Sequence, residues 1–242
     1  MNLIIDAGNT RVKAAVFEQS TLVEVLVIDR NFFLSEIKKI LKKHKISFGI
    51  LSSVSFIPEK KVEKLKYLLN LIVLSSSTKV PFINLYETPI TLGVDRIALV
   101  SGAVKKFPNK NILIIDAGTC ITFDFVNDKS AYFGGAISPG IEMRYKSLHA
   151  FTNKLPILEK KYPKNFIGKN TNESINSGIV NGVTQEIKGV INQYKKKYKD
   201  LTVVLTGGDT NFLAKQLKSS IFAHQNFLLE GLNEILIFNK NK

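Results

Sequence analysis

The chain has 242 residues, which is enough for one large domain or for two domains of about 110 residues each. Its hydrophobic fraction of 45% excludes a disordered chain, and no apolar run reaches the roughly 18 residues that span a bilayer, so we expect no membrane partner. The net charge of +14 would suit nucleic acid or anionic small molecules, but the lysines gather in runs typical of solvated helix faces, so we expect no specific nucleic-acid partner.

Cysteine usage and the first residues bear on the compartment. Cys120 is the one cysteine, so no disulfide can form within the chain. The start, MNLIIDAGNT, has neither a basic region nor a small-residue cleavage site, and we therefore expect no signal peptide. These features predict a reducing compartment, the cytoplasm.

Strand and helix patterns alternate along the first half of the chain. Residues 2–7 and 12–17 are β-rich runs separated by Gly-Asn-Thr-Arg, which predicts a hairpin with its turn at Gly8–Arg11. The other elements expected in this half are strands at 22–29, 48–54 and 71–76 and helices at 33–45, 58–70 and 94–107.

The second half repeats this order. Residues 111–118 and 119–126 predict a second hairpin, and 131–140 predicts a strand with a glycine-rich turn. Helices are then expected at 141–155, 171–198 and 211–220, with a strand at 201–208 that ends in a glycine pair. The break in composition at FPNKN divides the chain into two related α/β units, residues 1–109 and 110–242.

Both halves begin with the same six letters, LIIDAG, at 3–8 and 113–118. In the first copy Gly8 permits a tight turn, free backbone N–H groups and Lys13 can surround a phosphate, and Asp6 can hold a metal ion. The second copy offers the same loop with hydroxyls and no lysine. One such copy would often be an ordinary turn, but two at domain spacing favour a polyphosphate site with one loop on each wall of a cleft.

Two further glycine-rich stretches can approach a ligand. The pair in LTGGD, 205–209, follows a buried strand and would let the flat ring of an adenosine lie against the backbone. The stretch GGAISPG, 134–140, can be a phosphate loop or a wall of the substrate pocket, and we prefer the wall.

Five motifs in a fixed order resemble the actin, sugar kinase and Hsp70 ATPase superfamily and, within it, the type III pantothenate kinase family. They are DAGNTRVK (6–13), YETPITLGVDR (86–96), DAGTCIT (116–122), GGAISPGIEMRYKSL (134–148) and TGGD (206–209). The resemblance covers essentially the whole chain. It implies an α/β fold of duplicated ribonuclease H-like (actin-like ATPase) domains with a cleft between them, and transfer of a phosphoryl group from ATP to pantothenate, the first step of coenzyme A biosynthesis.

The resemblance also implies roles for individual residues. The catalytic base is Asp95, just before a predicted helix, where a carboxylate is favoured. The residues implied in pantothenate binding are Tyr86, Gly93, Val94, Asp95, Arg96 and Thr171. Those implied in ATP binding are Asp6, Ala7, Gly8, Asn9, Thr10, Arg11, Val12, Lys13 and Thr119.

Cofactors and partners follow from the same resemblance. It implies Mg²⁺ with ATP, and a monovalent cation, K⁺ or NH₄⁺, held by Asp116, although the residues alone would equally allow Mg²⁺ at Asp116. It implies a homodimer in which Thr171 closes the pantothenate pocket from the partner subunit. On the residues alone, Thr171 could as well be a helix N-cap.

Two other classes of function stay open at this point. A DNA-binding regulatory protein would suit the basic charge, but it has no need for Asp6, Lys13, Asp95 and Asp116 together. Another kinase or phosphatase of the superfamily could act on a sugar or on polyphosphate, and the turn at Gly93–Arg96 argues against that reading.

Overall fold

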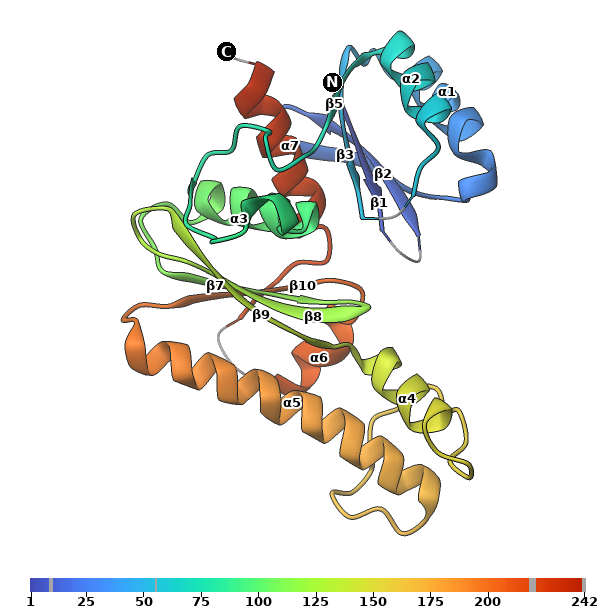
Figure 1. The fold of residues 1–242 in the computed structure, drawn as a ribbon, viewed down its shortest axis with the longest axis vertical. Coiled ribbons are helices and arrows are strands. Elements are labelled where there is room, and N and C mark those ends of the chain that lie inside the picture. The colour runs from blue at the N-terminus through green and yellow to red at the C-terminus, as the bar shows by residue number, and fades with distance from the viewer. Residues whose placement is uncertain (9–10, 55, 218–220, 241–242) are drawn as a thin grey trace. The chain divides into compact units, whose positions relative to one another are not determined.

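The computed structural model describes residues 1–8, 11–54, 56–217 and 221–240 (Figure 1). Its strands are β1 (Asn2–Ala7), β2 (Val12–Glu18), β3 (Thr21–Ile28), β4 (Phe48–Ser53), β5 (Asn70–Val73), β6 (Ile83–Asn84), β7 (Ile112–Ala117), β8 (Cys120–Val126), β9 (Ala131–Pro139), β10 (Thr202–Thr206) and β11 (Phe222–Ala223). Its helices are α1 (Phe33–Lys43), α2 (Glu59–Leu68), α3 (Val94–Lys106), α4 (Ile141–Ala150), α5 (Thr171–Lys197), α6 (Thr210–Leu217) and α7 (Phe227–Lys240). Short 3-10 turns, η1 (Arg30–Phe32) and η2 (Pro89–Thr91), precede α1 and α3.

The two halves of the chain build sheets of the same strand order. The first sheet has the order β3-β2-β1-β4-β5, and the corresponding part of the second has the order β9-β8-β7-β10-β11. In each, the hairpin that begins with LIIDAG is antiparallel, and the next strand along the sheet pairs parallel with its first strand. The predicted α/β fold is therefore confirmed together with its duplication, whereas the cleft between the units stays a prediction.

The core of the first unit lies between its sheet and α1 and α2, which cover one face together (Figure 1). Alternate residues of β1 and β2 point into it, because successive side chains of a strand face opposite sides. Helix α1 contributes Phe33, Ile37 and Ile40, which recur at the spacing of one helix face. The alternate residues Asn2, Ile4 and Asp6 face the opposite side of the sheet, where α7 packs against β1.

The core of the second unit lies against α5 and α6, on one face of the second sheet (Figure 1). Helix α5 buries a stripe at every fourth position, formed by Ile175, Ile179, Val183, Ile187 and Ile191. Ser177, Val180 and Thr184, beside this stripe, are buried as well, so the buried face of α5 is wider than one row of residues.

The C-terminal helix returns to the first unit. The chain divides into two compact units, residues 1–108, 130–133 and 226–242 in the first and residues 109–129 and 134–225 in the second. Helix α7 packs on α3 and β1, where Asn2 Nδ2 donates to Asn233 Oδ1 at 2.8 Å. The first boundary between the units falls at 108/109, and the first unit also includes this last helix and residues 130–133, so the expected division into 1–109 and 110–242 stays a prediction.

Some local expectations differ from the structure. The strand at 131–139 continues through Gly134 and Gly135, so the glycine-rich turn expected within it is wrong. The strand ends at Pro139, and the third glycine of GGAISPG, Gly140, is the N-cap of α4. The helix expected at 141–155 stops at Ala150. The two-residue strands β6 and β11 have too few residues to produce a periodic signal. Among the described residues, no helix combines the length and the apolar content needed to cross a bilayer.

Candidate active site

The end of β1 carries Asp6 into a row of polar side chains. Asp6 lies opposite Lys13 of β2 on one side and opposite Ser52 of β4 on the other. Since paired residues on neighbouring strands share a face, the three side chains lie on the face away from α1 and α2. Ala7 and Val12 point instead into the helix-covered core, so only their backbone groups could contact a nucleotide.

The carboxyl group of Asp6 titrates unusually. Its pKa is raised from 3.8 to about 6, chiefly because burial disfavours the carboxylate; the charge of Lys13 lowers this pKa, and the negative charge of Asp95 raises it. The two carboxyl groups, far apart in sequence, therefore lie close enough to influence each other. A buried carboxyl group whose charged form is disfavoured in this way is typical of a functional site.

Gly8 and Arg11 close the described ends of the first hairpin loop. The Gly8 N–H donates to the carbonyl of Arg11 at 3.1 Å, and the guanidinium of Arg30 donates to the Gly8 carbonyl. Two of the residues expected to bind ATP, Asn9 and Thr10, lie outside the described residues. Arg11 is exposed at the tip. The described part of the loop is thus a hairpin tip that Arg30 ties to the segment before α1.

Asp95 lies in the first turn of α3. Gly93 is the N-cap of this helix and Val94 its first residue. The Oδ1 atom of Asp95 accepts the Arg96 N–H at 2.8 Å, and a Cβ on Gly93 would lie only 2.5 Å from that same Oδ1. Glycine at this position therefore leaves room for the carboxylate, and the helix N-terminus favours its charged form.

Arg96 and Tyr86, predicted together from the sequence, are brought together by the fold. The Arg96 guanidinium is buried and lies 5.5 Å from the centre of the Tyr86 ring. Tyr86 stacks on the buried ring of Tyr132 at 6.2 Å, and its N–H donates to Asn84 Oδ1 at 3.0 Å. The guanidinium thus lies beside an aromatic stack, and its planar fork of donors suits a carboxylate ligand.

The second unit repeats the polar row at the end of β7. Asp116 lies opposite Thr122 of β8 and opposite Thr206 of β10. Among the described residues, the buried hydroxyls of Thr122 and Thr206 have no hydrogen-bond partner. Ser52 beside Asp6 has the same property. Buried polar groups normally find partners, so these hydroxyl oxygens are available to a water, an ion or a ligand at each row.

The turn after β10 closes against Asp116. Gly207 has φ +94°, which a side chain would strain, and a Cβ there would lie 2.3 Å from Asp116 Oδ1. The neighbouring Gly208 has open space where its Cβ would point. The glycine pair thus combines one residue packed on the Asp116 carboxylate with one that presents bare backbone.

Thr119 and Thr171 stand at exposed ends of elements in the second unit. Thr119 is exposed at the tip of the hairpin between β7 and β8, and its carbonyl accepts the Gly140 N–H at 3.1 Å. Thr171 is the first residue of α5, but the N-cap is Asn170, whose side chain accepts the Glu173 N–H at 3.0 Å. The reading of Thr171 as an N-cap is therefore wrong.

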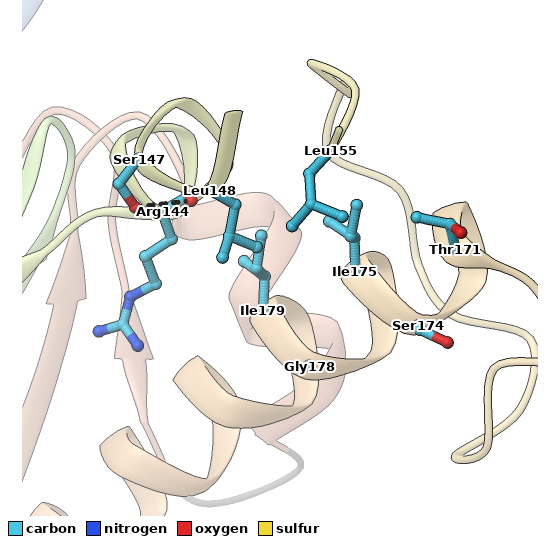
Figure 2. A pocket seen from close by; sticks show the side chains of 9 residues that line it. All are labelled: Arg144, Ser147, Leu148, Leu155, Thr171, Ser174, Ile175, Gly178 and Ile179. Carbon is cyan, nitrogen blue, oxygen red and sulfur yellow. Dashed lines mark hydrogen bonds between the residues drawn. The ribbon is translucent and has the colours of Figure 1, made fainter. Parts of the chain in front are cut away.

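Thr171 borders an open groove of about 750 Å³ between α4 and α5 (Figure 2). Leu148 and Leu155 point toward Ile175 and Ile179 across its floor, with Thr171 at one end (Figure 2). Arg144 lies at the other end, where it pairs with Glu186 at 2.5 Å. The groove is apolar along its length and polar at both ends.

The candidate metal ligands in the described part of the chain are single carboxylates and not clusters of side chains. Among the described residues, no group of three His, Cys, Asp or Glu could hold a metal ion. Single carboxylates beside hydroxyl oxygens remain, at Asp6 and at Asp116. Such oxygen sets fit a hard cation that takes its other ligands from phosphates and water.

Sequence reasoning missed Ser52 and Arg30, and it gave no individual role to Thr122 and Thr206, although these two belong to the motifs DAGTCIT and TGGD. Ser52 and Arg30 carry no local signal, because their positions depend on strand register and on a contact made across the fold.

Comparisons with known proteins place the chain among kinases. A family model described as type III pantothenate kinase matches residues 2–193. A type III pantothenate kinase from Christiangramia forsetii is 50% identical over 243 residues, covering 100% of both chains. Among solved structures, a candidate Baf family transcriptional activator from Campylobacter jejuni has a TM-score of 0.65 at 23% identity, covering 99% of this chain and 100% of its own. An activator of 2-hydroxyisocaproyl-CoA dehydratase from Clostridium difficile, with bound ADPNP, has a TM-score of 0.58 at 11% identity, with 99% and 95% covered. At these identities the two structures show the fold alone.

Proposed function

Since the chain belongs to the type III pantothenate kinase family, we propose that the Asp95 carboxylate is the base that prepares pantothenate for phosphorylation. The protein transfers the γ-phosphoryl group of ATP to the primary hydroxyl of pantothenate and so begins coenzyme A biosynthesis. The pantothenate oxygen forms a bond to phosphorus, the bond to ADP breaks, and the hydroxyl proton passes to Asp95.

The observation that carries this proposal is the electrostatic contact between Asp95 and Asp6. The charge of Asp95 raises the pKa of Asp6, so the proposed base stands near the carboxylate proposed for the phosphates and Mg²⁺. A base of this kind must be within reach of the hydroxyl that attacks the phosphorus. Gly93 supports the assignment, because it leaves the Asp95 carboxylate room at the start of α3.

Pantothenate carries a carboxylate, which Arg96 would bind. The guanidinium is buried beside Tyr86, where a charge-assisted pair with a carboxylate is strong. Tyr86 would add a flat wall, and the Gly93–Val94 backbone would complete this part of the pocket. Binding pantothenate at Arg96 would direct its hydroxyl toward Asp95, one residue earlier in the same helical turn.

ATP would be held from both polar rows. Lys13 offers a cation to the phosphates, and Asp6 with the unpartnered Ser52 hydroxyl offers oxygens that fit Mg²⁺. The described backbone of Gly8 and Arg11, and Thr119 in the second unit, would donate further hydrogen bonds. A bound Mg²⁺ supplies positive charge against the triphosphate. Since ATP is an intracellular donor and the chain has one cysteine, we place the protein in the cytoplasm.

Asp116 would hold the monovalent cation, K⁺ or NH₄⁺. Thr122 and Thr206 lie opposite it on the neighbouring strands, and among the described residues their buried hydroxyl groups have no hydrogen-bond partner. Replacing K⁺ by Na⁺ should lower pantothenate-dependent ADP release at least about tenfold, a cost of about 1.4 kcal/mol in the transition state. The assay is ADP release with ATP, Mg²⁺ and pantothenate in either salt.

The matched variant for the cation is Asp116→Asn. This variant should be slow in both salts and should no longer distinguish K⁺ from Na⁺. Equal rates of the unaltered protein in the two salts would refute a cation at Asp116. Absence of ADP release in any salt, with ATP still bound, would refute pantothenate as the acceptor.

A homodimer would bring Thr171 to the pantothenate pocket of the partner subunit. The apolar groove beside Thr171 supports this, because Leu148, Leu155, Ile175 and Ile179 offer a surface that a second copy could cover (Figure 2). Mixing Asp95→Asn protomers with Thr171→Tyr protomers tests it. If each pocket takes Thr171 from the partner, random pairing in a twofold dimer restores about a quarter of full activity.

The separate parent variants serve as controls for this mixture. Each alone should be nearly inactive, and sedimentation equilibrium should show dimers in every sample. No recovery after mixing, although mixed dimers have formed, would place Thr171 in its own protomer's pocket or in none.

A further inference from the structure

The loop between α4 and α5, residues 151–170, reaches the beginning of α6. We propose that Lys160 in this loop is a positioning residue for the Gly207–Gly208 turn, and that it thereby sets the affinity for the adenosine part of ATP. The inference rests on the proposed function, in which this turn receives the nucleotide. It assigns to Lys160 a role in ATP affinity that no sequence motif indicates.

The first observation is an ion pair on the turn itself. Lys160 Nζ donates to Asp209 Oδ1, and the Asp209 residue is only 7% exposed, whereas the Lys160 side chain is 44% exposed. An exposed ion pair contributes little to stability, but a buried carboxylate that loses its partner is strongly unfavourable. Without Lys160, the Asp209 carboxylate would have to move toward water.

The second observation is that Asp209 is locked to the turn on its backbone side. Its N–H donates to the carbonyl of Ala117 at the end of β7 at 2.9 Å, and its carbonyl accepts the Leu213 N–H at 2.9 Å. The Thr210 hydroxyl donates to the Gly207 carbonyl at 2.7 Å. A displacement of Asp209 would therefore move the glycine pair together with the first turn of α6.

The third observation is that the loop makes further contacts with α6 besides the ion pair. The Tyr162 ring stacks on Phe212 with centres 4.0 Å apart and planes within 6°. The Tyr162 hydroxyl donates to the Phe212 carbonyl at 2.5 Å, and the Lys161 backbone N–H bonds the Tyr145 hydroxyl of α4. These contacts hold the loop on α6 without the Lys160–Asp209 pair, and the Lys160 ammonium also lies 5.6 Å from the centre of the Phe212 ring.

The fourth observation concerns the surface that the turn presents. Gly207 packs on Asp116 Oδ1, and Gly208, directly before Asp209, has open space where a Cβ would point. A flat ring could lie against that bare backbone. The position of Gly208 therefore depends on Asp209, whose buried carboxylate is paired with Lys160.

The test is Lys160→Met, with Lys161→Met as the matched control. Both changes remove one positive charge from the same loop, and among the described residues the Lys161 side chain has no ion pair. For Lys160→Met we expect the KM for ATP to rise about tenfold, equivalent to about 1.4 kcal/mol, with the KM for pantothenate and kcat within about twofold. Lys161→Met should leave all three constants unchanged.

Two further variants separate positioning from general damage. Lys160→Arg keeps the ion pair and should keep the KM for ATP. Adding Asp209→Asn to Lys160→Met removes the unpaired charge and should recover most of the lost affinity. A KM for ATP that stays unchanged in Lys160→Met, or that rises equally in Lys161→Met, overturns the proposal.

Binding measurements keep the inference separate from the proposed function. Measured by calorimetry, Lys160→Met should lower the affinity for ADP about tenfold and leave the affinity for inorganic tripolyphosphate unchanged, because only ADP carries the adenosine. Equal weakening of both would mean a charge effect on phosphates and would refute positioning of the turn. A protein that binds ADP in this pattern but does not phosphorylate pantothenate would refute the proposed function and leave the role of Lys160 intact.

Discussion

Replacing Asp95 by Asn should lower kcat by about 10²–10⁴-fold, the usual contribution of a general base, while ATP still binds. The amide has the same shape, and its oxygen can still accept the Arg96 N–H that Asp95 Oδ1 accepts at 2.8 Å. It cannot take the proton of the pantothenate hydroxyl. Steady-state ADP release gives kcat, and calorimetry with ADP reports the nucleotide site.

Gly93→Ala provides a graded control for the same assignment. The new Cβ would lie 2.5 Å from Asp95 Oδ1, so the carboxylate has to move, whereas the φ of −56° at Gly93 tolerates a side chain. We expect kcat to fall by about 10–100-fold, between the unaltered protein and Asp95→Asn, because small misplacements of a catalytic group are costly. Normal kcat in Asp95→Asn would exclude Asp95 as the base. Normal kcat in Gly93→Ala would show that the position of the Asp95 carboxylate beside Gly93 does not matter for turnover.

The repeated LIIDAG shows how far sequence reasoning carries. Identical letters at 3–8 and 113–118 predict two equivalent hairpins, and the fold places Asp6 and Asp116 at equivalent positions of two sheets with the same order. Both faces of these two strands are buried, since Ile4, Ile5, Ile114 and Ile115 are all in the core. The family resemblance then supplied Asp95, Arg96 and Tyr86, which the fold brings together within one unit.

What could not be predicted depends on register and on contacts made across the fold. Ser52 and Thr206 become neighbours of the two aspartates only through parallel strand pairing, which no local pattern specifies. The Lys160–Asp209 pair joins a loop without regular structure to a helix start. The return of α7 to the first unit has the same origin, because an apolar helix pattern gives no indication of which sheet it will cover.

Replacing Asp6 by Asn should stabilise the protein at neutral pH and abolish its function. Burial is the main reason that the pKa of Asp6 rises from 3.8 to about 6. Between these two values the folded protein binds more protons than the unfolded chain, so stability falls as the pH rises through this window. Above about pH 6 the buried Asp6 carboxylate destabilises the folded protein by its full amount, about 3 kcal/mol at 1.36 kcal/mol per pKa unit.

The expected result is therefore a difference that depends on pH. Asp6→Asn should have a larger free energy of unfolding than the unaltered protein by up to about 3 kcal/mol at pH 7.5, and by little near pH 4. Urea unfolding at several pH values measures it. Lys13→Met is the control. The Lys13 charge lowers the pKa of Asp6 in the folded protein, so in this variant the upper end of the window in which stability falls should move to higher pH, while its lower end stays near 3.8. A difference that is constant from pH 4 to pH 8 would contradict the burial of this carboxylate.

The same variant distinguishes a stability cost from a functional requirement. If Asp6 holds Mg²⁺ with ATP, adding both should stabilise the unaltered protein, because a ligand that binds the folded state shifts the unfolding equilibrium. Asp6→Asn should gain much less from the same addition. Its greater stability without ligand would then coincide with lost turnover, and the buried charge at the end of β1 would be explained by the nucleotide that it serves rather than by the fold that contains it.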